Sequence, residues 1–188
     1  MNRIPVLIAS AALAALSASA ATAECFNLSK HFPNGPFAGG TVAIDGWKVE
    51  LKLEEFYGPP NANPPTPNPG YAEMWDQQCF GDERALWLNN INLRILVDGE
   101  PAVETANVNF CNYGGYSNVD VANNRPPKYI GPIMATPSPM EDNNGNVVNV
   151  GVRGSNAEGK LTFEQPGGNL TNMMVGGQEF FVSSICLN

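Results

Sequence analysis

The chain has 188 residues and is acidic, with 18 aspartate and glutamate residues against 10 lysine and arginine residues and a formal net charge of −8. A chain so poor in basic residues does not build the cationic surface that holds nucleic-acid phosphates, so we expect no nucleic-acid partner. Glycine, proline and asparagine contribute 19, 16 and 23 residues, and these poor helix formers exclude a helical bundle. An apolar fraction of 43% excludes a disordered chain.

Residues 1–23 have the pattern of an export signal. A basic residue is followed by an apolar run from Ile4 to about Leu16, and Ala21-Thr22-Ala23 fits the small-x-small rule for cleavage. The apolar run is shorter than the ~20 residues that cross a bilayer, which argues against a membrane anchor. The sequence therefore predicts a signal peptide over 1–23 and a secreted or periplasmic single domain over 24–188.

All four cysteines lie in the part that is expected to be exported. An even number of cysteines in an oxidising compartment favours two disulfides, for which three connectivities are possible. We predict the pairs Cys25–Cys186 and Cys79–Cys111, the first of which would join the first and last strands. No pair has the spacing of a zinc site, so we expect no metal–thiolate centre.

Apolar and polar residues alternate with a period of two along much of the chain, which predicts short strands with one buried face. On this reading the polar positions, such as Asn92 and Arg94, face solvent. Phe180 to Leu187 is apolar at both parities and is expected to be buried on both faces. A short helical turn is predicted near Ala72–Gln77. The predicted strands lie at 42–44, 47–53, 91–97, 106–110, 119–121, 148–152, 161–163 and 180–187.

Turn residues separate these strands, and the pattern predicts an all-β, antiparallel β-sandwich. Asp45-Gly46 is expected to form either a two-residue hairpin turn or a bulge. The segment 58–70 contains six prolines. Because proline lacks a backbone donor, we expect this Pro-rich loop to run extended over the surface rather than inside a sheet.

From Trp87 onward the chain resembles a family of uncharacterised, secreted bacterial proteins that are expected to be jelly-roll-like β-sandwiches. The resemblance is carried by Asn89–Arg94, Tyr113-Gly114-Gly115, Val147–Val152 and the closing Gly176–Phe181 with Cys186. Family members typically carry two acidic residues in the closing strand. Serines stand at those positions here, 183 and 184, so the resemblance implies that any cation site of the relatives is lost.

Catalytic chemistry finds little support in the sequence. The single histidine, His31, has no evident nucleophile or orienting partner, and no Gly-rich nucleotide fingerprint is present. The adjacent carboxylates at 54–55, 82–83 and 141–142 would point to opposite faces of a strand, so we expect solvated charges there. A carboxylate pair from separate strands, such as Glu50 with Glu179, would be needed for a polysaccharide hydrolase or lyase.

A structural calcium ion is conceivable at Asp142, Asn144 and Asn146, which alternate around Gly145. The glycine comes one place early for a calcium loop and no closing glutamate follows, so a plain hairpin turn is favoured. We therefore predict no cofactor.

Aromatic residues provide the best indication of binding. Tyr57, Tyr71 and Trp75 surround the Pro-rich loop, and Tyr113 and Tyr116 flank a Gly-Gly turn. Flat rings beside Asn and Asp side chains suit sugar recognition, although the same rings could simply cover the ends of a sandwich. The leading hypothesis is a non-enzymatic module that binds a glycan or another cell-surface component. The alternatives are a small polysaccharide hydrolase or lyase and a self-associating matrix protein.

Overall fold

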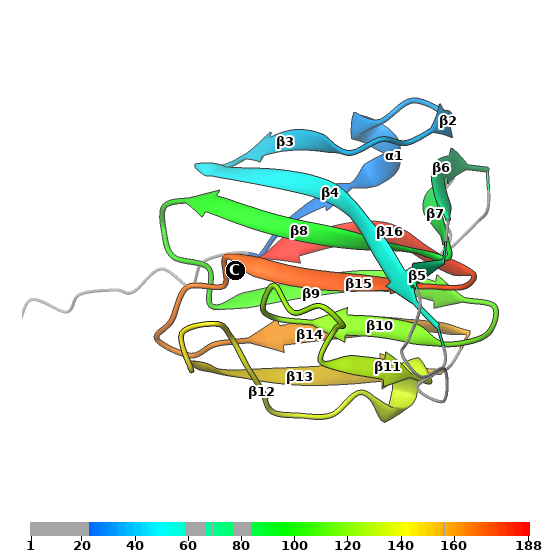
Figure 1. Ribbon diagram of the computed structural model, residues 1–188. Helices are drawn as coiled ribbons and strands as arrows, with labels where there is room; N and C mark the ends of the chain where they lie inside the picture. The colour runs from blue at the N-terminus through cyan, green and yellow to red at the C-terminus, as the bar shows by residue number, and fades with distance from the viewer. Residues whose placement is uncertain (1–22, 59–66, 69, 77–83, 156) are drawn as a thin grey trace, which may run out of the picture.

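The computed structural model describes residues 23–58, 67–68, 70–76, 84–155 and 157–188, which form an antiparallel β-sandwich of two sheets (Figure 1). The expected fold class is therefore confirmed. The predicted leader up to residue 22 and most of the Pro-rich loop lie outside the described residues, as does Gln77. No helix in the described part of the chain is long and apolar enough to cross a membrane.

The larger sheet has nine strands within the described residues. The long strands β9 and β16 pair with each other in the middle of the sheet, and β1 pairs with the second half of β16. In order across the sheet the strands are β12 (Met140–Glu141), β13 (Val147–Gly154), β14 (Glu158–Glu164), β9 (Thr105–Asn112), β16 (Phe180–Leu187), β7 (Ala85–Asn89), β6 (Tyr71–Trp75) and β2 (Gly35–Pro36), with β1 (Glu24–Asn27) beside β16.

The smaller sheet has seven strands within the described residues. Its long strand β4 bends across the sheet towards β5, as Figure 1 shows. In order the strands are β11 (Tyr129–Gly131), β10 (Ser117–Asp120), β15 (Asn172–Gly177), β8 (Ile91–Gly99), β4 (Trp47–Tyr57) and β3 (Gly40–Ile44), with β5 (Pro67–Asn68) beside β4. Two single-turn helices, α1 (Leu28–His31) and η1 (Ile133–Ala135), complete the secondary structure of the described residues.

Consecutive strands cross repeatedly from one sheet to the other. The strands β7, β8, β9 and β10 alternate between the sheets, and β14, β15 and β16 do so again, which is the connectivity of jelly-roll-like sandwiches. The inward-facing residues of every long strand form one continuous apolar core between the sheets, with Phe110, Phe163 and Phe180 among its largest side chains. Burial of this apolar area supplies the main driving force for folding.

The β3–β4 hairpin follows directly from its turn residues. Asp45 and Gly46 both adopt positive φ, 38° and 94°, as the type I′ turn of a two-residue hairpin requires. The turn sets Ile44 opposite Trp47. The apolar residues of β3 and β4 therefore lie on the same face of the sheet. The structure thus decides between the two expected conformations of Asp45-Gly46 in favour of the hairpin turn.

The two ends of the domain are joined covalently. Strand β1 lies beside β16 with Cys25 directly opposite Cys186, and these two residues form a disulfide. This confirms the first predicted pair. Cys111 is also disulfide-bonded, but Cys79 lies outside the described residues, so the pair Cys79–Cys111 stays a prediction.

Two local expectations are corrected or refined. The predicted helical turn near Ala72–Gln77 is wrong, because Tyr71–Trp75 form strand β6 between β2 and β7; alternation places Ala72 and Met74 in the core. In β16 the residues Phe180–Ser183 are all buried, as expected, whereas Ser184 and Cys186 are only half-buried.

Candidate functional site

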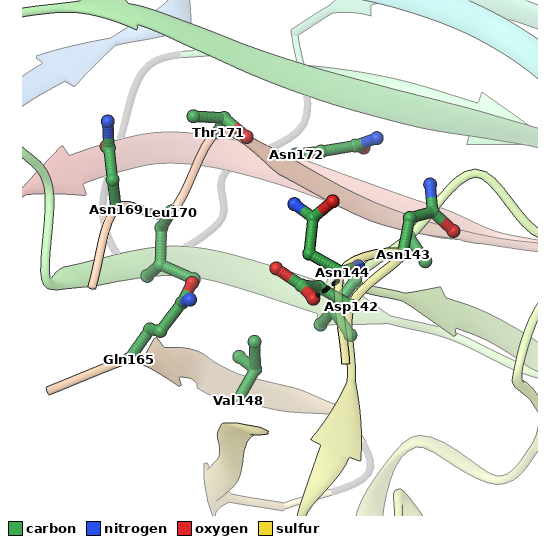
Figure 2. Close-up of a pocket in the computed structure, with 11 residues that line it drawn as sticks. Asp142, Asn143, Asn144, Val148, Gln165, Asn169, Leu170, Thr171 and Asn172 are labelled. Carbon is green, nitrogen blue, oxygen red and sulfur yellow. Dashed lines mark hydrogen bonds between the residues drawn. The ribbon is translucent and has the colours of Figure 1, made fainter. Parts of the chain in front are cut away.

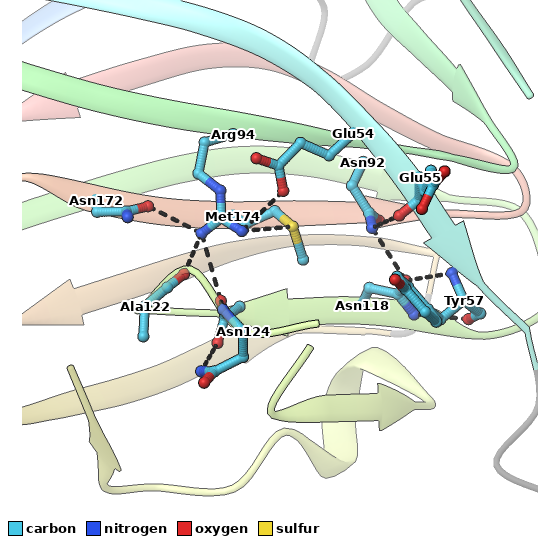
Figure 3. A network of polar contacts seen from close by, with 11 residues as sticks. Glu54, Glu55, Tyr57, Asn92, Arg94, Asn118, Ala122, Asn124, Asn172 and Met174 are labelled. Atoms are coloured by element: carbon cyan, nitrogen blue, oxygen red, sulfur yellow. Dashed lines mark hydrogen bonds and ion pairs between the residues drawn. The ribbon is translucent and has the colours of Figure 1, made fainter. Parts of the chain in front are cut away.

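A buried polar network around Arg94 on β8 occupies part of the outer face of the seven-stranded sheet. The Arg94 side chain is almost completely buried. Its guanidinium donates to the Glu54 carboxylate at 2.8 Å and to the Asp120 carboxylate at 3.3 Å. It also donates to the Asn172 side chain at 2.8 Å and to the backbone carbonyl of Ala122 (Figure 3). Four acceptors from three separate segments of the chain therefore converge on one cation.

A second group of hydrogen bonds continues this network along β8. The Asn92 amide donates to the Glu55 carbonyl at 2.6 Å and to the Asn118 side-chain oxygen at 3.1 Å. The Asn118 carboxamide in turn accepts from the Tyr57 N–H and donates to the Tyr57 carbonyl, both at 2.9 Å. It thereby holds the bent end of β4 over the sheet. Gly176 leaves room for Asn92, since a Cβ there would lie 2.3 Å from the Asn92 oxygen.

The expected solvent exposure of these polar residues is therefore wrong. Arg94 and Asn92 do alternate with apolar residues, but the end of β4 and the segment after β10 cover them. Glu54, expected as a solvated charge, has a side chain only 17% exposed because it pairs with Arg94. Neutralisation by two carboxylates and direct hydrogen bonds make this burial tolerable.

The outer face of the nine-stranded sheet carries an aromatic row, which consists of Tyr71, Trp75, Trp87, Phe181 and Tyr113. The strand register explains why these residues lie together on one face. Trp87 on β7 lies directly opposite Glu73 on β6 and directly opposite Phe181 on β16. Residues two apart on a strand share a face, so Tyr71 and Trp75 flank Glu73 on that same face.

The rings of the aromatic row contact one another in sequence. Trp87 meets Tyr71 and Trp75 edge-on, with centroid distances of 5.2 and 5.4 Å, and stacks parallel to Phe181 at 5.8 Å. Tyr113 meets Phe181 edge-on at 5.3 Å. These are favourable aromatic geometries, and they hold the outer rings in fixed orientations.

Exposure divides the row into covered and exposed rings. Phe181 is only 6% exposed, whereas Tyr71, Trp75 and Tyr113 are 47%, 46% and 51% exposed. Polar groups lie beside the exposed rings: Glu73 between Tyr71 and Trp75 on β6, and the exposed Glu179 next to Tyr113. The arrangement offers flat apolar faces together with hydrogen-bonding groups.

Three of the five predicted binding residues thus come together, and two do not. Tyr57 is half-buried at the end of β4 on the other sheet, and Tyr116 lies half-buried in the turn after β9, where its N–H donates to Gln178. Sequence reasoning missed Trp87 and Phe181, which form the middle of the row. An available signal was the double-sided apolar character of 180–187, which requires that Phe181 face outward if Phe180 faces the core.

The candidate calcium loop around Gly145 is a hairpin turn between β12 and β13. The Asp142 carboxylate accepts the N–H groups of Asn144 and Asn146, each at 2.8 Å, and the Asn146 side-chain amide at 3.0 Å. The turn lines a polar hollow of about 80 Å³ together with Gln165 and Asn172 (Figure 2). No group of three or more His, Cys, Asp or Glu side chains that could hold a metal ion occurs among the described residues.

Lowering the pH is expected to remove the contribution of Asp142 to this turn. Partial burial raises the pKa of Asp142, but hydrogen bonds from Asn146 and Asn144 and the charge of Lys128 outweigh it and lower the pKa below its ordinary value. Such a carboxylate stabilises the fold above its unfolded pKa and loses this contribution as the pH falls through its folded pKa. Asp142→Ala should lower Tm at neutral pH, with a difference that shrinks below about pH 4. Thermal unfolding across this range measures it, and a difference independent of pH contradicts it.

Within the described residues, the catalytic candidates that the sequence indicated do not form a common site. His31 is exposed at the end of α1, with an edge-on contact to Phe26. Glu50 forms an exposed ion pair with Lys52 on the seven-stranded sheet, while Glu179 belongs to the turn beside Tyr113. The hypothetical pair of Glu50 with Glu179 is therefore split between the two sheets.

The fold and this face define an all-β sandwich whose nine-stranded sheet bears an aromatic row on its outer face. Comparison with family models, with curated proteins and with solved structures gave no significant match for the chain. The resemblance to secreted jelly-roll-like proteins therefore stays a prediction.

Proposed function

We propose that the chain is an exported, non-enzymatic module that binds a glycan on the outer face of its nine-stranded sheet. The observation that supports this function best is the aromatic row, in which three half-exposed rings pack against the partly buried Trp87 and the buried Phe181 on one face. Sugar rings present apolar C–H faces that stack on aromatic side chains, while their hydroxyls require polar partners at the rim.

Preorganisation favours binding by these rings. A large, rigid aromatic side chain loses little conformational entropy on binding, and here neighbouring rings already restrict Tyr71 and Trp75. Glu73 and Asn89 lie on the same face as these rings and supply an acceptor and a carboxamide for hydroxyl groups. The site therefore combines stacking with hydrogen bonding.

Export is part of the proposal. A disulfide between the chain ends is typical of proteins that fold in an oxidising compartment. The sequence of residues 1–23 has the pattern of a signal peptide. A periplasmic or extracellular location would bring the aromatic row into contact with cell-surface polysaccharides.

Removal of an exposed ring from the row should weaken polysaccharide binding. For Trp75→Ala and Tyr71→Ala we expect affinity to fall about ten-fold each, which corresponds to the loss of one interface anchor. Affinity electrophoresis against neutral and acidic polysaccharides, followed by calorimetry with the best ligand, measures the change.

Tyr57→Ala is the matched control, because it removes a tyrosine ring that lies outside the row, on the other sheet, and it should leave affinity unchanged. Binding to no polysaccharide, or binding that Trp75→Ala and Tyr71→Ala both leave intact, would refute the glycan function. Release of reducing ends from a bound polysaccharide would favour the hydrolase alternative.

A further inference from the structure

A second part of the same outer face carries a positively charged hollow. The hollow has a volume of about 420 Å³ and lies over β13, β14 and β9. Its lining combines hydroxyl and carboxamide groups with two cations and includes Asn107, Asn149, Thr162, Arg153 and Lys160. Such a lining can hydrogen-bond a polar ligand and attract a negative charge.

The two cations, Arg153 and Lys160, face each other across neighbouring strands. Their Cα atoms are register partners in the β13–β14 pair, and like charges at directly opposite positions are unfavourable. Neither side chain forms an ion pair or a hydrogen bond with any residue that the structure describes. An anion placed between them would relieve this repulsion, and no described carboxylate does so.

The carboxylates nearest in register leave this cation pair uncompensated. Glu164 also lines the hollow, but it lies four residues beyond Lys160, a separation of about 13 Å along an extended strand. Glu158 lies two residues before Lys160 on the same face and already has an interaction of its own. The chain as a whole has a net charge of −8. Two neighbouring cations without an ion-pair partner among the described residues therefore set this face apart from the acidic character of the chain.

A continuous polar path links the hollow to the aromatic row. On the outer face Thr162 donates to the Asn107 side chain at 2.8 Å, and Asn109 donates to the Ser184 hydroxyl at 2.8 Å. These pairs bridge β14, β9 and β16, the strands between Arg153 on β13 and Trp87 on β7. Four strand intervals of ~4.8 Å place β13 about 19 Å from β7, a span that an extended polysaccharide covers with several sugar units.

We infer, on the basis of the proposed glycan-binding function, that the ligand is an acidic polysaccharide. Its sugar faces stack on Tyr71, Trp75 and Tyr113, and one of its anionic groups lies between Arg153 and Lys160. Carboxylate and sulfate groups share the required chemistry, since both accept charge-assisted hydrogen bonds from guanidinium and ammonium donors.

The test compares three probes: polygalacturonate, dextran sulfate and a neutral dextran. At low salt, Arg153→Ala and Lys160→Ala should each weaken binding of the acidic polysaccharide about two- to five-fold, and the double variant about ten-fold, as for partly exposed ion pairs. Added sodium chloride should weaken binding of the wild type more than binding of the double variant. Preference for polygalacturonate or dextran sulfate identifies the anionic group.

A double variant at Lys48 and Lys52, both changed to Ala, is the charge-matched control, because these exposed lysines lie on the opposite sheet. It should retain affinity for the acidic probe. Equal loss in both double variants, or tighter binding of neutral dextran than of both acidic probes, would overturn the acidic specificity while leaving the aromatic row in place. Absence of binding to all three probes would overturn the glycan function itself. Acidic binding that needs Arg153 and Lys160 but not Trp75 would refute the aromatic row alone.

Discussion

Arg94→Met is expected to destabilise the fold by about 3–5 kcal/mol, because it breaks a buried ion pair by removing one partner. Methionine has a similar length and fills much of the space of the arginine stem. It leaves the fully buried Asp120 carboxylate and the nearly buried Glu54 carboxylate without their cation. Denaturant unfolding at neutral pH measures the loss.

Arg94→Lys refines this expectation. Lysine keeps the charge, but a single ammonium group cannot serve the acceptors that the guanidinium reaches on Glu54, Asp120 and Asn172 at once. Its stability should fall between those of the wild type and Arg94→Met. If both variants lose equal stability, geometry rather than charge controls the network.

Lys52→Met is the matched control for Arg94→Met. Lys52 lies directly opposite Arg94 in register, and its ion pair with Glu50 is exposed, with side chains 51% and 42% accessible. Exposed pairs contribute about 0–1 kcal/mol, so this variant should stay close to wild-type stability. A loss for Arg94→Met no larger than the loss for Lys52→Met would contradict the structural role of the network.

Removal of the Cys25–Cys186 disulfide should cost about 2–5 kcal/mol. The bond joins residues separated by 161 positions, and a long closed loop restricts the unfolded chain strongly. Cys25 is exposed and Cys186 half-buried, so serine at both positions removes the cross-link with little loss of packing. Chemical unfolding of the Cys25→Ser, Cys186→Ser variant measures the effect.

Single variants provide the control for the disulfide. Cys25→Ser alone should destabilise nearly as much as the double change, because either substitution abolishes the same bond. A change in stability below about 1 kcal/mol would mean that pairing of the short strand β1 with β16 suffices to hold the chain end.

The sequence by itself determined much of the local structure. Alternation with a period of two identified the long strands, since successive side chains of a strand point to opposite faces. Asp45-Gly46 indicated either a hairpin turn or a bulge, and the positive φ of both residues in the structure identifies the hairpin turn. The even number of cysteines and their positions near the chain ends led to the Cys25–Cys186 pair, which the structure confirms.

Only the tertiary structure decided what covers each outer face. Period-two alternation places Arg94 on the outer face of β8 but says nothing of what lies over that face, and the end of β4 bends across it. The aromatic row likewise depends on strand order, because β6, β7 and β16 become neighbours through pairings between distant parts of the chain. Local patterns assign faces within one strand, whereas long-range pairing brings Trp75, Trp87 and Tyr113 into one surface and leaves Tyr57 and Tyr116 outside it.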